Sequence, residues 1–206
     1  MPTLPTFEIE QKIKHELNVT LVCGIDEAGR GPLAGRVYAA SVILPDDFVL
    51  EGLNDSKKLS EKKRELFFDI IREKALSCAV AFAESDEIDS MNILNATMLA
   101  MRRAVSLLDP QPQAALVDGS VARGFEIPAT AVVKGDSLSM SIAAASVLAK
   151  VSRDRYCMEL DALYPQYRFA VHKGYPTKEH MELVRKYGPC PAHRRSFLGF
   201  LSKKPI

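Results

Sequence analysis

Apolar and polar residues follow one another along the chain in segments that predict an α/β fold. β-Branched and apolar runs predict strands over residues 20–26, 36–44, 78–83, 114–118 and 126–133. Apolar positions at helical spacing predict helices over residues 7–17, 60–76, 92–108, 139–163 and 177–186. This order of elements fits a mixed sheet with helices packed on its faces.

Three of these segments allow more detailed predictions. The strands over 20–26 and 36–44 follow each other too soon for a crossover helix, which predicts antiparallel neighbours. Ser60 is expected to cap the helix over 60–76 at its N-terminus. Its apolar face is expected to consist of Leu66, Phe67, Ile70 and Ile71.

The composition is that of an ordinary folded protein. Of 206 residues, 47% are hydrophobic and 26% are charged. No apolar run approaches the roughly 20 residues that span a bilayer, and residues 1–18 contain acidic side chains and lack an apolar signal core. We therefore expect a cytoplasmic protein without a membrane contact, folded as a single domain over 1–206 with a basic helical region from about residue 165.

The cysteines are spaced too widely for a disulfide framework. Such frameworks are dense, so the spacing favours reduced thiols at Cys23, Cys78, Cys157 and Cys190. Cys190 and His193 form a C-x-x-H pair, but a structural zinc site needs about four ligands and no second pair lies nearby in the sequence.

Charge is distributed unevenly along the chain. Residues 150–206 carry 12 Lys and Arg against 5 Asp and Glu, although the formal net charge of the whole chain is only +1. A basic segment attached to an acidic body suggests a surface that binds a polyanion such as nucleic acid. A solvated basic tail is the alternative explanation.

Acidic residues lie where predicted strands end. Asp26 and Glu27 lie at the end of the first strand, Asp118 ends the fourth, and Asp136 follows the fifth. Carboxylates leaving a sheet in this way can converge, and a convergent group suits Mg²⁺ or Mn²⁺. In two-metal phosphodiester cleavage, Asp26 is the candidate that bridges the two ions. Taken singly, an Asp at a strand end is better explained as a turn or helix-capping residue.

A glycine-rich turn follows the first acidic pair. Gly29 and Gly31 flank Arg30, so the backbone can approach a ligand closely, as recognition of a ribose 2′-hydroxyl requires. The pattern Gly29-x-Gly31-x-x-Ala34 also matches a dinucleotide-binding turn, with Glu51 near the expected ribose-binding distance. That turn must open a helix, whereas the residues after it predict a strand.

Three functions therefore stay open on the residues alone. They are a metal-dependent nuclease, an NAD-dependent oxidoreductase that uses the glycine turn, and a non-catalytic nucleic-acid-binding module that uses the basic region.

Seven motifs in order carry a family resemblance. They are C-G-I-D-E-A-G-R-G-P-L-A-G at 23–35, N-D-S-K-K-L at 54–59, M-N-I-L-N-A-T-M at 91–98, V-D-G at 117–119, K-G-D-S at 134–137, A-A-A-S-V-L-A-K-V-S-R-D at 143–154 and H-K-G-Y-P-T at 172–177. In these motifs the chain resembles ribonuclease HII, a type 2 ribonuclease H, from near its start to near its end.

The resemblance implies a fold, a reaction and a substrate. The fold is ribonuclease H-like, with a mixed five-stranded sheet flanked by helices and a helical C-terminal part. The implied enzyme is an endonuclease that hydrolyses the RNA strand of RNA–DNA hybrids and cuts 5′ of single ribonucleotides in duplex DNA. It uses two Mg²⁺ or Mn²⁺ ions and leaves 5′-phosphate and 3′-hydroxyl ends. Such an enzyme acts in DNA replication and repair. We expect a monomer whose partner is the duplex, with no protein partner.

The resemblance also implies roles for individual residues. The catalytic and metal-binding carboxylates would be Asp26, Glu27, Asp118 and Asp136. Gly29, Arg30 and Gly31 would read the ribose and its phosphate, and Tyr175 would lie against the sugar after the cut. Ser56 and Lys57 would hold the duplex backbone. Charge and location suit phosphate contacts at Lys150, Arg153, Lys173 and Arg194.

Overall fold

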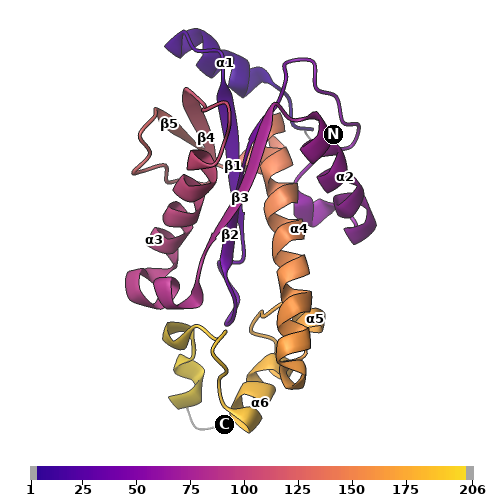
Figure 1. The fold of residues 1–206 in the computed structure, drawn as a ribbon, viewed down its shortest axis with the longest axis vertical. Helices are drawn as coiled ribbons and strands as arrows, with labels where there is room; N and C mark the ends of the chain where they lie inside the picture. Colours follow the sequence, from indigo (N-terminus) through magenta and orange to yellow (C-terminus); the bar gives the residue numbers. More distant parts are fainter. Residues whose placement is uncertain (1–3, 203–206) are drawn as a thin grey trace.

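A five-stranded mixed sheet lies between helical layers in the computed structural model, which describes residues 4–202 (Figure 1). The strands are β1 (Val22–Ala28), β2 (Val37–Ile43), β3 (Ser77–Ala83), β4 (Ala114–Asp118) and β5 (Ala129–Val132), in the spatial order β3-β2-β1-β4-β5. β2 pairs antiparallel with both β1 and β3, whereas β1–β4 and β4–β5 are parallel.

The predicted antiparallel pairing of the first two strands is confirmed. Because β2 and not a helix follows the glycine turn, the structure does not support the dinucleotide-binding interpretation.

Helices cover both faces of this sheet, and two short ones extend beyond it. The helices of the described residues are α1 (Glu8–Leu17), α2 (Glu61–Lys74), α3 (Ser85–Ser106), α4 (Met140–Leu163), α5 (Phe169–His172) and α6 (Lys178–Tyr187), of which α5 and α6 lie past the end of the sheet (Figure 1). α4 packs along β1 and β2 with α2 outside it, and α3 covers the opposite face (Figure 1). Ser60, Ser139 and Thr177 cap α2, α4 and α6, because each side chain accepts a hydrogen bond from a first-turn backbone N–H. None of the helices between residues 4 and 202 combines the length and apolar character that crossing a membrane requires.

The core has two main parts because β2 is buried on both faces. Ala40 and Val42 belong to the cluster under α2 and α4, whereas Ala39 and Ile43 belong to the cluster under α3. This alternation follows from the two-residue repeat of a strand. The central strands are therefore held rigidly between helices, which fixes the positions of the residues at their ends.

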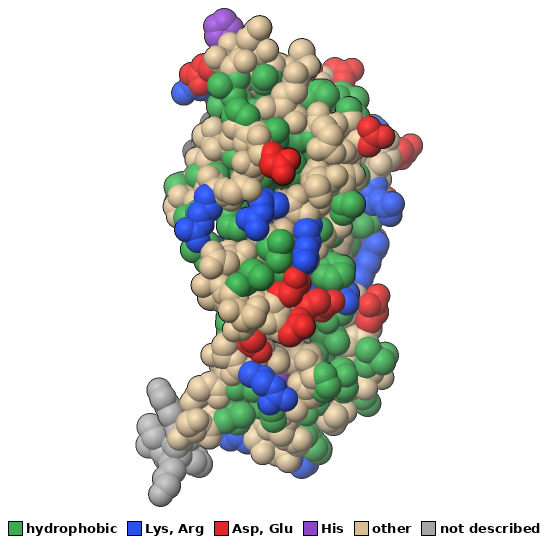
Figure 2. Space-filling model, turned by 60° about the vertical axis from the view of Figure 1, so that its left-hand side comes forward, with side chains coloured by type: hydrophobic (Ala, Val, Ile, Leu, Met, Phe, Trp, Pro, Cys, Tyr) green, Lys and Arg blue, Asp and Glu red, His purple; other side chains and the backbone are tan. Residues whose placement is uncertain are grey.

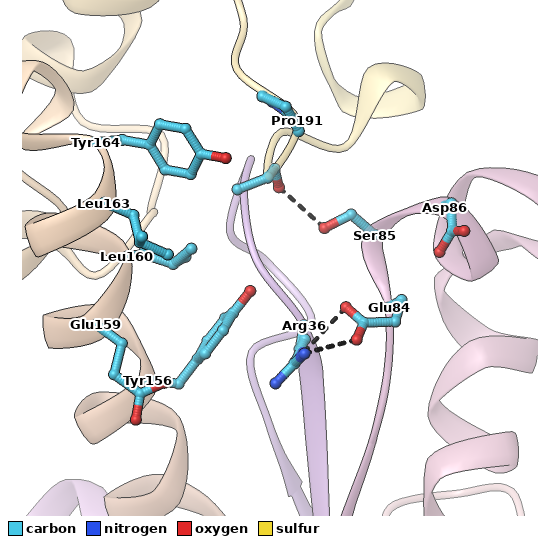
Figure 3. Close-up of a pocket in the computed structure, with 11 residues that line it drawn as sticks. Arg36, Glu84, Ser85, Asp86, Tyr156, Glu159, Leu160, Leu163, Tyr164 and Pro191 are labelled. Atoms are coloured by element: carbon cyan, nitrogen blue, oxygen red, sulfur yellow. Dashed lines mark hydrogen bonds and ion pairs between the residues drawn. The ribbon is translucent and has the colours of Figure 1, made fainter.

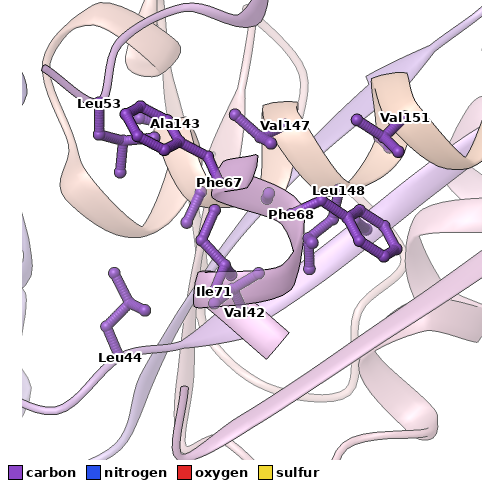
Figure 4. Close-up of a cluster of buried hydrophobic side chains, with 14 of the residues drawn as sticks. Val42, Leu44, Leu53, Phe67, Phe68, Ile71, Ala143, Val147, Leu148 and Val151 are labelled. Atoms are coloured by element: carbon purple, nitrogen blue, oxygen red, sulfur yellow. The ribbon is translucent and has the colours of Figure 1, made fainter. Parts of the chain in front are cut away.

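The apolar face of α2 differs from the prediction at two residues. Phe67, Phe68 and Ile71 are buried against α4 (Figure 4), whereas Leu66 is 58% exposed. The prediction placed Leu66 on the buried face and omitted Phe68. The helix turns about 100° per residue, so its orientation against α4 decides which member of an apolar run is buried.

α3 begins earlier than the predicted start at residue 92. Asn92 has φ 68° within the helix, and its side chain accepts hydrogen bonds from the N–H groups of Leu94 and Asn95. Asn92 therefore caps the second half of α3, which is the part that the sequence predicted. The first part, from Ser85, was missed.

Candidate active site

Asp26, Asp118 and Asp136 converge at one edge of the sheet. β1 and β4 are parallel with Ile25 opposite Val117, so the two following aspartates leave the sheet side by side. Asp118 Oδ1 accepts hydrogen bonds from the N–H groups of Gly135 at 2.7 Å and Asp136 at 3.4 Å. One oxygen from each aspartate lies within 4.8 Å of the others. The predicted convergence of these three residues is thus found in the structure.

The electrostatics of this group favour a bound cation. Burial raises the pKa of Asp26 well above its usual value, and the neighbouring Glu27 and Asp118 raise it further. Burial, Asp55 and Asp118 likewise raise the pKa of Asp136. Crowded carboxylates of this kind are stabilised either by protonation or by a divalent cation, and their hard oxygens fit Mg²⁺ or Mn²⁺.

Glu27 lies beside this group and contacts Arg30. Its Oε1 is 3.5 Å from Arg30 Nη1, and its side chain is 16% exposed. Burial raises the pKa of Glu27, whereas Arg30 lowers it. Glu27 is not one of the three residues whose oxygens lie within 4.8 Å of one another, and its role as a metal ligand stays a prediction.

Ser56 and Lys57 lie on a 3₁₀ turn (Ser56–Lys58) across from the carboxylates. The Ser146 hydroxyl donates to Ser56 Oγ at 2.8 Å, and all three residues line one cavity with Asp26. Burial lowers the pKa of Lys57, but Asp55, Asp26 and the other aspartates outweigh it and hold the pKa above its usual range. Ser146 was missed from the sequence because it lies in a run of small helical residues that indicates only close packing.

A cavity of about 260 Å³ adjoins the carboxylates, and the glycine turn forms one of its walls. Gly29 has φ +101°, and an added Cβ would lie 2.1 Å from Arg153 Nε, so only glycine fits here. Tyr175 stands opposite the turn, because a Cβ on Gly31 would lie 3.6 Å from its ring. The structure thus brings Gly29, Arg30, Gly31 and Tyr175 together beside Asp26 and Glu27.

The predicted phosphate-binding residues differ in their surroundings. Lys150 lines the cavity but is paired with Asp154 at 2.5 Å. Arg153 is buried and donates through Nη2 to the Lys173 carbonyl at 2.8 Å, while its Nε and Nη1 find no hydrogen-bond partner within residues 4–202. The Lys173 ammonium lies 3.5 Å from Met158 Sδ, and Lys173 does not line the cavity. Their roles in phosphate binding stay predictions.

The prediction for Arg194 is wrong. Its side chain is completely buried and donates hydrogen bonds to five backbone carbonyls, so it does not face a phosphate. Charge in a sequence does not reveal burial, and a guanidinium can replace its water contacts with carbonyl oxygens when several of them converge.

A second cavity, of about 560 Å³, lies between α4 and the start of α3 (Figure 3). Arg36 Nη2 pairs with Glu84 Oε1 at 2.7 Å, and the Ser85 hydroxyl donates to the Ala192 carbonyl. Tyr156 and Leu160 supply the opposite wall from α4. Because none of the predicted site residues lines this cavity, it is not the candidate active site.

Sequence comparisons agree with the geometry of the site. The family model described as ribonuclease HII matches residues 23–199. The chain belongs to the ribonuclease HII family. Ribonuclease HII of Paracidovorax citrulli is 58% identical over 86% of this chain and 74% of that protein. Ribonuclease HII of Caldicellulosiruptor saccharolyticus is 50% identical over 93% of each chain. The chain is thus a ribonuclease H, an endonuclease that cleaves RNA in RNA–DNA hybrids.

Solved structures show the same fold. Ribonuclease HII in its complex with PCNA from Archaeoglobus fulgidus has a TM-score of 0.73 and 24% identity, and the match covers 85% of this chain and 94% of that one. Bst-RNase HIII in complex with Mn²⁺ has a TM-score of 0.74 and 18% identity, covering 91% of this chain and 70% of that one. The expected ribonuclease H-like fold is confirmed.

Proposed function

We propose that this ribonuclease H also cuts DNA duplexes at single embedded ribonucleotides, on the 5′ side, leaving 5′-phosphate and 3′-hydroxyl ends. The observation that carries the proposal is the convergence of three aspartates, one of which, Asp26, lines a cavity walled by Gly29–Arg30–Gly31 and Tyr175. An enzyme that reads one ribose within DNA needs its sugar-reading groups next to its reacting groups.

In this proposal Asp26, Asp118 and Asp136, together with Glu27, hold two Mg²⁺ or Mn²⁺ ions. When bound, such ions supply Lewis acidity and activate water for phosphodiester hydrolysis. The crowded, buried carboxylates support the proposal, as does the Mn²⁺ in the Bst-RNase HIII structure. Lys57 adds a positive charge near these aspartates, which suits contact with a phosphate.

The glycine turn and Tyr175 are proposed to select the sugar. Gly29 and Gly31 bring the backbone to the cavity surface, where its polar groups can meet a 2′-hydroxyl. The Tyr175 side chain, 42% exposed across the cavity, offers a flat apolar face to the following sugar. A deoxyribose lacks the hydroxyl, so these polar contacts would be lost on an all-DNA duplex.

Several broader expectations stay predictions. We propose that the nucleic-acid partner includes ribonucleotide-containing DNA and that the chain works as a cytoplasmic monomer with one catalytic domain. The Archaeoglobus fulgidus relative was solved with PCNA, which makes the expectation of no protein partner worth testing against a sliding clamp.

Cleavage-site mapping on a DNA duplex with one ribonucleotide tests the proposed reaction. With Mg²⁺ or Mn²⁺ the protein should nick the strand 5′ of the ribonucleotide, because only there is a 2′-hydroxyl available to the glycine turn. The same duplex without a ribonucleotide should stay intact. A hybrid that is cut while the single-ribonucleotide duplex survives would contradict the proposal.

Asp26→Asn tests the proposed metal site. Loss of the central carboxylate should lower cleavage at least about 100-fold, because the cation loses a ligand and its charge balance. The melting temperature in EDTA should be at least that of the wild type, since a buried, repelled carboxylate has been removed. If the variant retained its activity, Asp26 would not be a ligand of the catalytic metal.

A further inference from the structure

His193 and Arg194 lie behind the two walls of the 260 Å³ cavity, and neither residue lines it. One wall is the glycine turn, residues 29–36. The other is the tyrosine loop, residues 172–177, which carries Tyr175. The segment around His193 pairs with the glycine turn through an antiparallel bridge between Ala34 and His193. Its backbone is therefore fixed against one wall.

Arg194 holds the glycine turn from behind. Its backbone N–H donates to the Leu33 carbonyl at 2.8 Å, and its side chain crosses under the turn. The guanidinium donates to the carbonyls of Gly29 at 2.6 Å, Arg30 at 3.0 Å, Pro32 at 2.8 Å, Gly35 at 2.8 Å and Arg36 at 3.2 Å. A guanidinium presents five N–H groups in a planar fork, whereas an ammonium presents three from one point.

This contact fixes the direction of the backbone donors of the turn. In a trans peptide the N–H points opposite to the C=O. Because the Gly29 and Arg30 carbonyls point at Arg194, the N–H groups of Arg30 and Gly31 point away from it. Arg30 and Gly31 both line the cavity. Arg194 therefore sets the orientation of donors that a ribose or phosphate would meet.

His193 reaches the tyrosine loop through His180. The Cys190 N–H donates to His193 Nδ1 at 3.0 Å, which leaves the proton of a neutral His193 on Nε2. His193 Nε2 lies 3.1 Å from His180 Nε2, and His180 Nδ1 lies 2.9 Å from the Tyr175 carbonyl oxygen. A carbonyl only accepts, so His180 carries its proton on Nδ1 and accepts at Nε2. The contacts at Cys190 and at Tyr175 therefore require the same direction of the hydrogen bond between the two histidines, with His193 Nε2 donating to His180 Nε2.

The two walls are also joined directly. The Leu33 N–H donates to the Gly174 carbonyl at 2.8 Å, and Arg153 donates to the neighbouring Lys173 carbonyl. A shift of either wall therefore strains the other, so the distance between Gly31 and Tyr175 depends on contacts behind the cavity.

We propose that His193 and Arg194 are positioning residues for sugar recognition: Arg194 holds the glycine turn, and His193 holds Tyr175 through His180. This inference rests on the proposed function of the cavity. It assigns no contact with substrate to either residue.

Arg194→Lys, His180→Phe and His180→Gln test the inference on a duplex with one ribonucleotide. Lysine keeps the charge but loses the fork. Phenylalanine keeps the ring but loses both hydrogen bonds, whereas glutamine retains one donor and one acceptor. Arg195→Lys and His15→Phe change exposed residues of the same types and serve as matched controls. The measurements are kcat, KM, the Kd of the uncut duplex in EDTA, and the melting temperature.

We expect kcat to fall about 10- to 100-fold in Arg194→Lys and His180→Phe, because misplaced substrate-positioning groups cost rate. KM and Kd should stay within about twofold, since phosphate contacts dominate binding. His180→Gln should recover most of the rate, and both controls should match the wild type.

Several outcomes would overturn the inference. They are unchanged kcat in both damaging variants, equal loss in His180→Gln and His180→Phe, or failure of all three variants to fold, which would indicate a role in general stability. If only Arg194→Lys fails to fold, the comparison of His180→Phe with His180→Gln still tests the inference. A wild type that leaves the single-ribonucleotide duplex uncut contradicts the proposed function instead.

Discussion

Burial lowers the pKa of three neighbouring histidines, His172, His180 and His193. Burial lowers the pKa of His180 to about 4, and burial together with His180 lowers that of His193 to about 4. The ring of His172 stacks on His180 with 4.2 Å between centroids, and burial lowers its pKa too. A proton added to His180 Nε2 would face the N–H of His193, so the cluster has no place for a positive charge.

This arrangement predicts how stability depends on pH. Because the pKa values in the folded state lie below the unfolded value of 6.5, the histidines stabilise fully above pH 6.5 and lose that contribution as the pH falls toward about 4. The free energy of unfolding should therefore fall more steeply over this range in the wild type than in His180→Gln. Urea denaturation at stepped pH in EDTA measures both. The aspartates titrate in both proteins, so parallel curves would contradict the prediction.

Single residues of the site were predictable to different degrees. Asp26 and Asp118 follow from the sequence because strand ends can be read from apolar runs and parallel neighbours end at one edge. Arg194 does not, because its partners are backbone carbonyls of the glycine turn more than a hundred residues away. Side-chain charge indicates chemistry, but only the fold decides whether the charge meets solvent or carbonyl oxygens.

β1 and α4 pack so closely that the sheet edge and the helix act together. An added Cβ at Gly24 would lie 2.2 Å from the backbone carbon of Ser141 and 2.3 Å from the nitrogen of Ile142. Asp26 lies two residues farther along β1, and Ser146 lies one turn farther along α4. The spacing of these two elements therefore sets the width of the site.

Gly24→Ala should destabilise the protein by about 3 kcal/mol, because helix backbone cannot move aside as a side-chain tip can. Activity should fall as well, since the helix must shift away from Asp26. Chemical denaturation and cleavage assays measure the two effects. Gly199→Ala is the matched control, because nothing lies within 4 Å of its added Cβ, and it should change stability by less than about 0.5 kcal/mol. Equal stability of the two variants would show that β1 and α4 tolerate separation.

Elements were predicted more completely than their details. Strands and long helices were found because apolar periodicity extends over many residues. The first part of α3 was missed because Asn92, with φ 68°, carries a capping signal in the middle of the helix. Leu66 was wrongly predicted to be buried, because a run of apolar residues does not reveal which side of α2 faces α4. Tertiary packing, not propensity, decides both points.

The C-terminal region exposes fewer unpaired basic side chains than its sequence suggests. Arg153 and Arg194 are buried, and Lys150 and Arg168 are paired with acidic side chains. Figure 2 shows a face on which basic and acidic side chains of the described residues are mixed. Affinity for a duplex should therefore depend on a few exposed cations near the carboxylates, and Lys57 is the clearest of them.

Lys57→Ala should weaken binding of an uncut duplex and make it less dependent on salt. Each phosphate neutralised by a lysine releases counterions, which contributes about 0.9 to the slope of log K against log salt concentration. The slope should therefore become shallower by about 1 in titrations with EDTA at several salt concentrations. Lys12→Ala removes an exposed lysine of α1 that does not line the cavity, and should leave the slope unchanged. If Lys57→Ala also left it unchanged, the positive charge of Lys57 would serve the neighbouring aspartates and not the duplex.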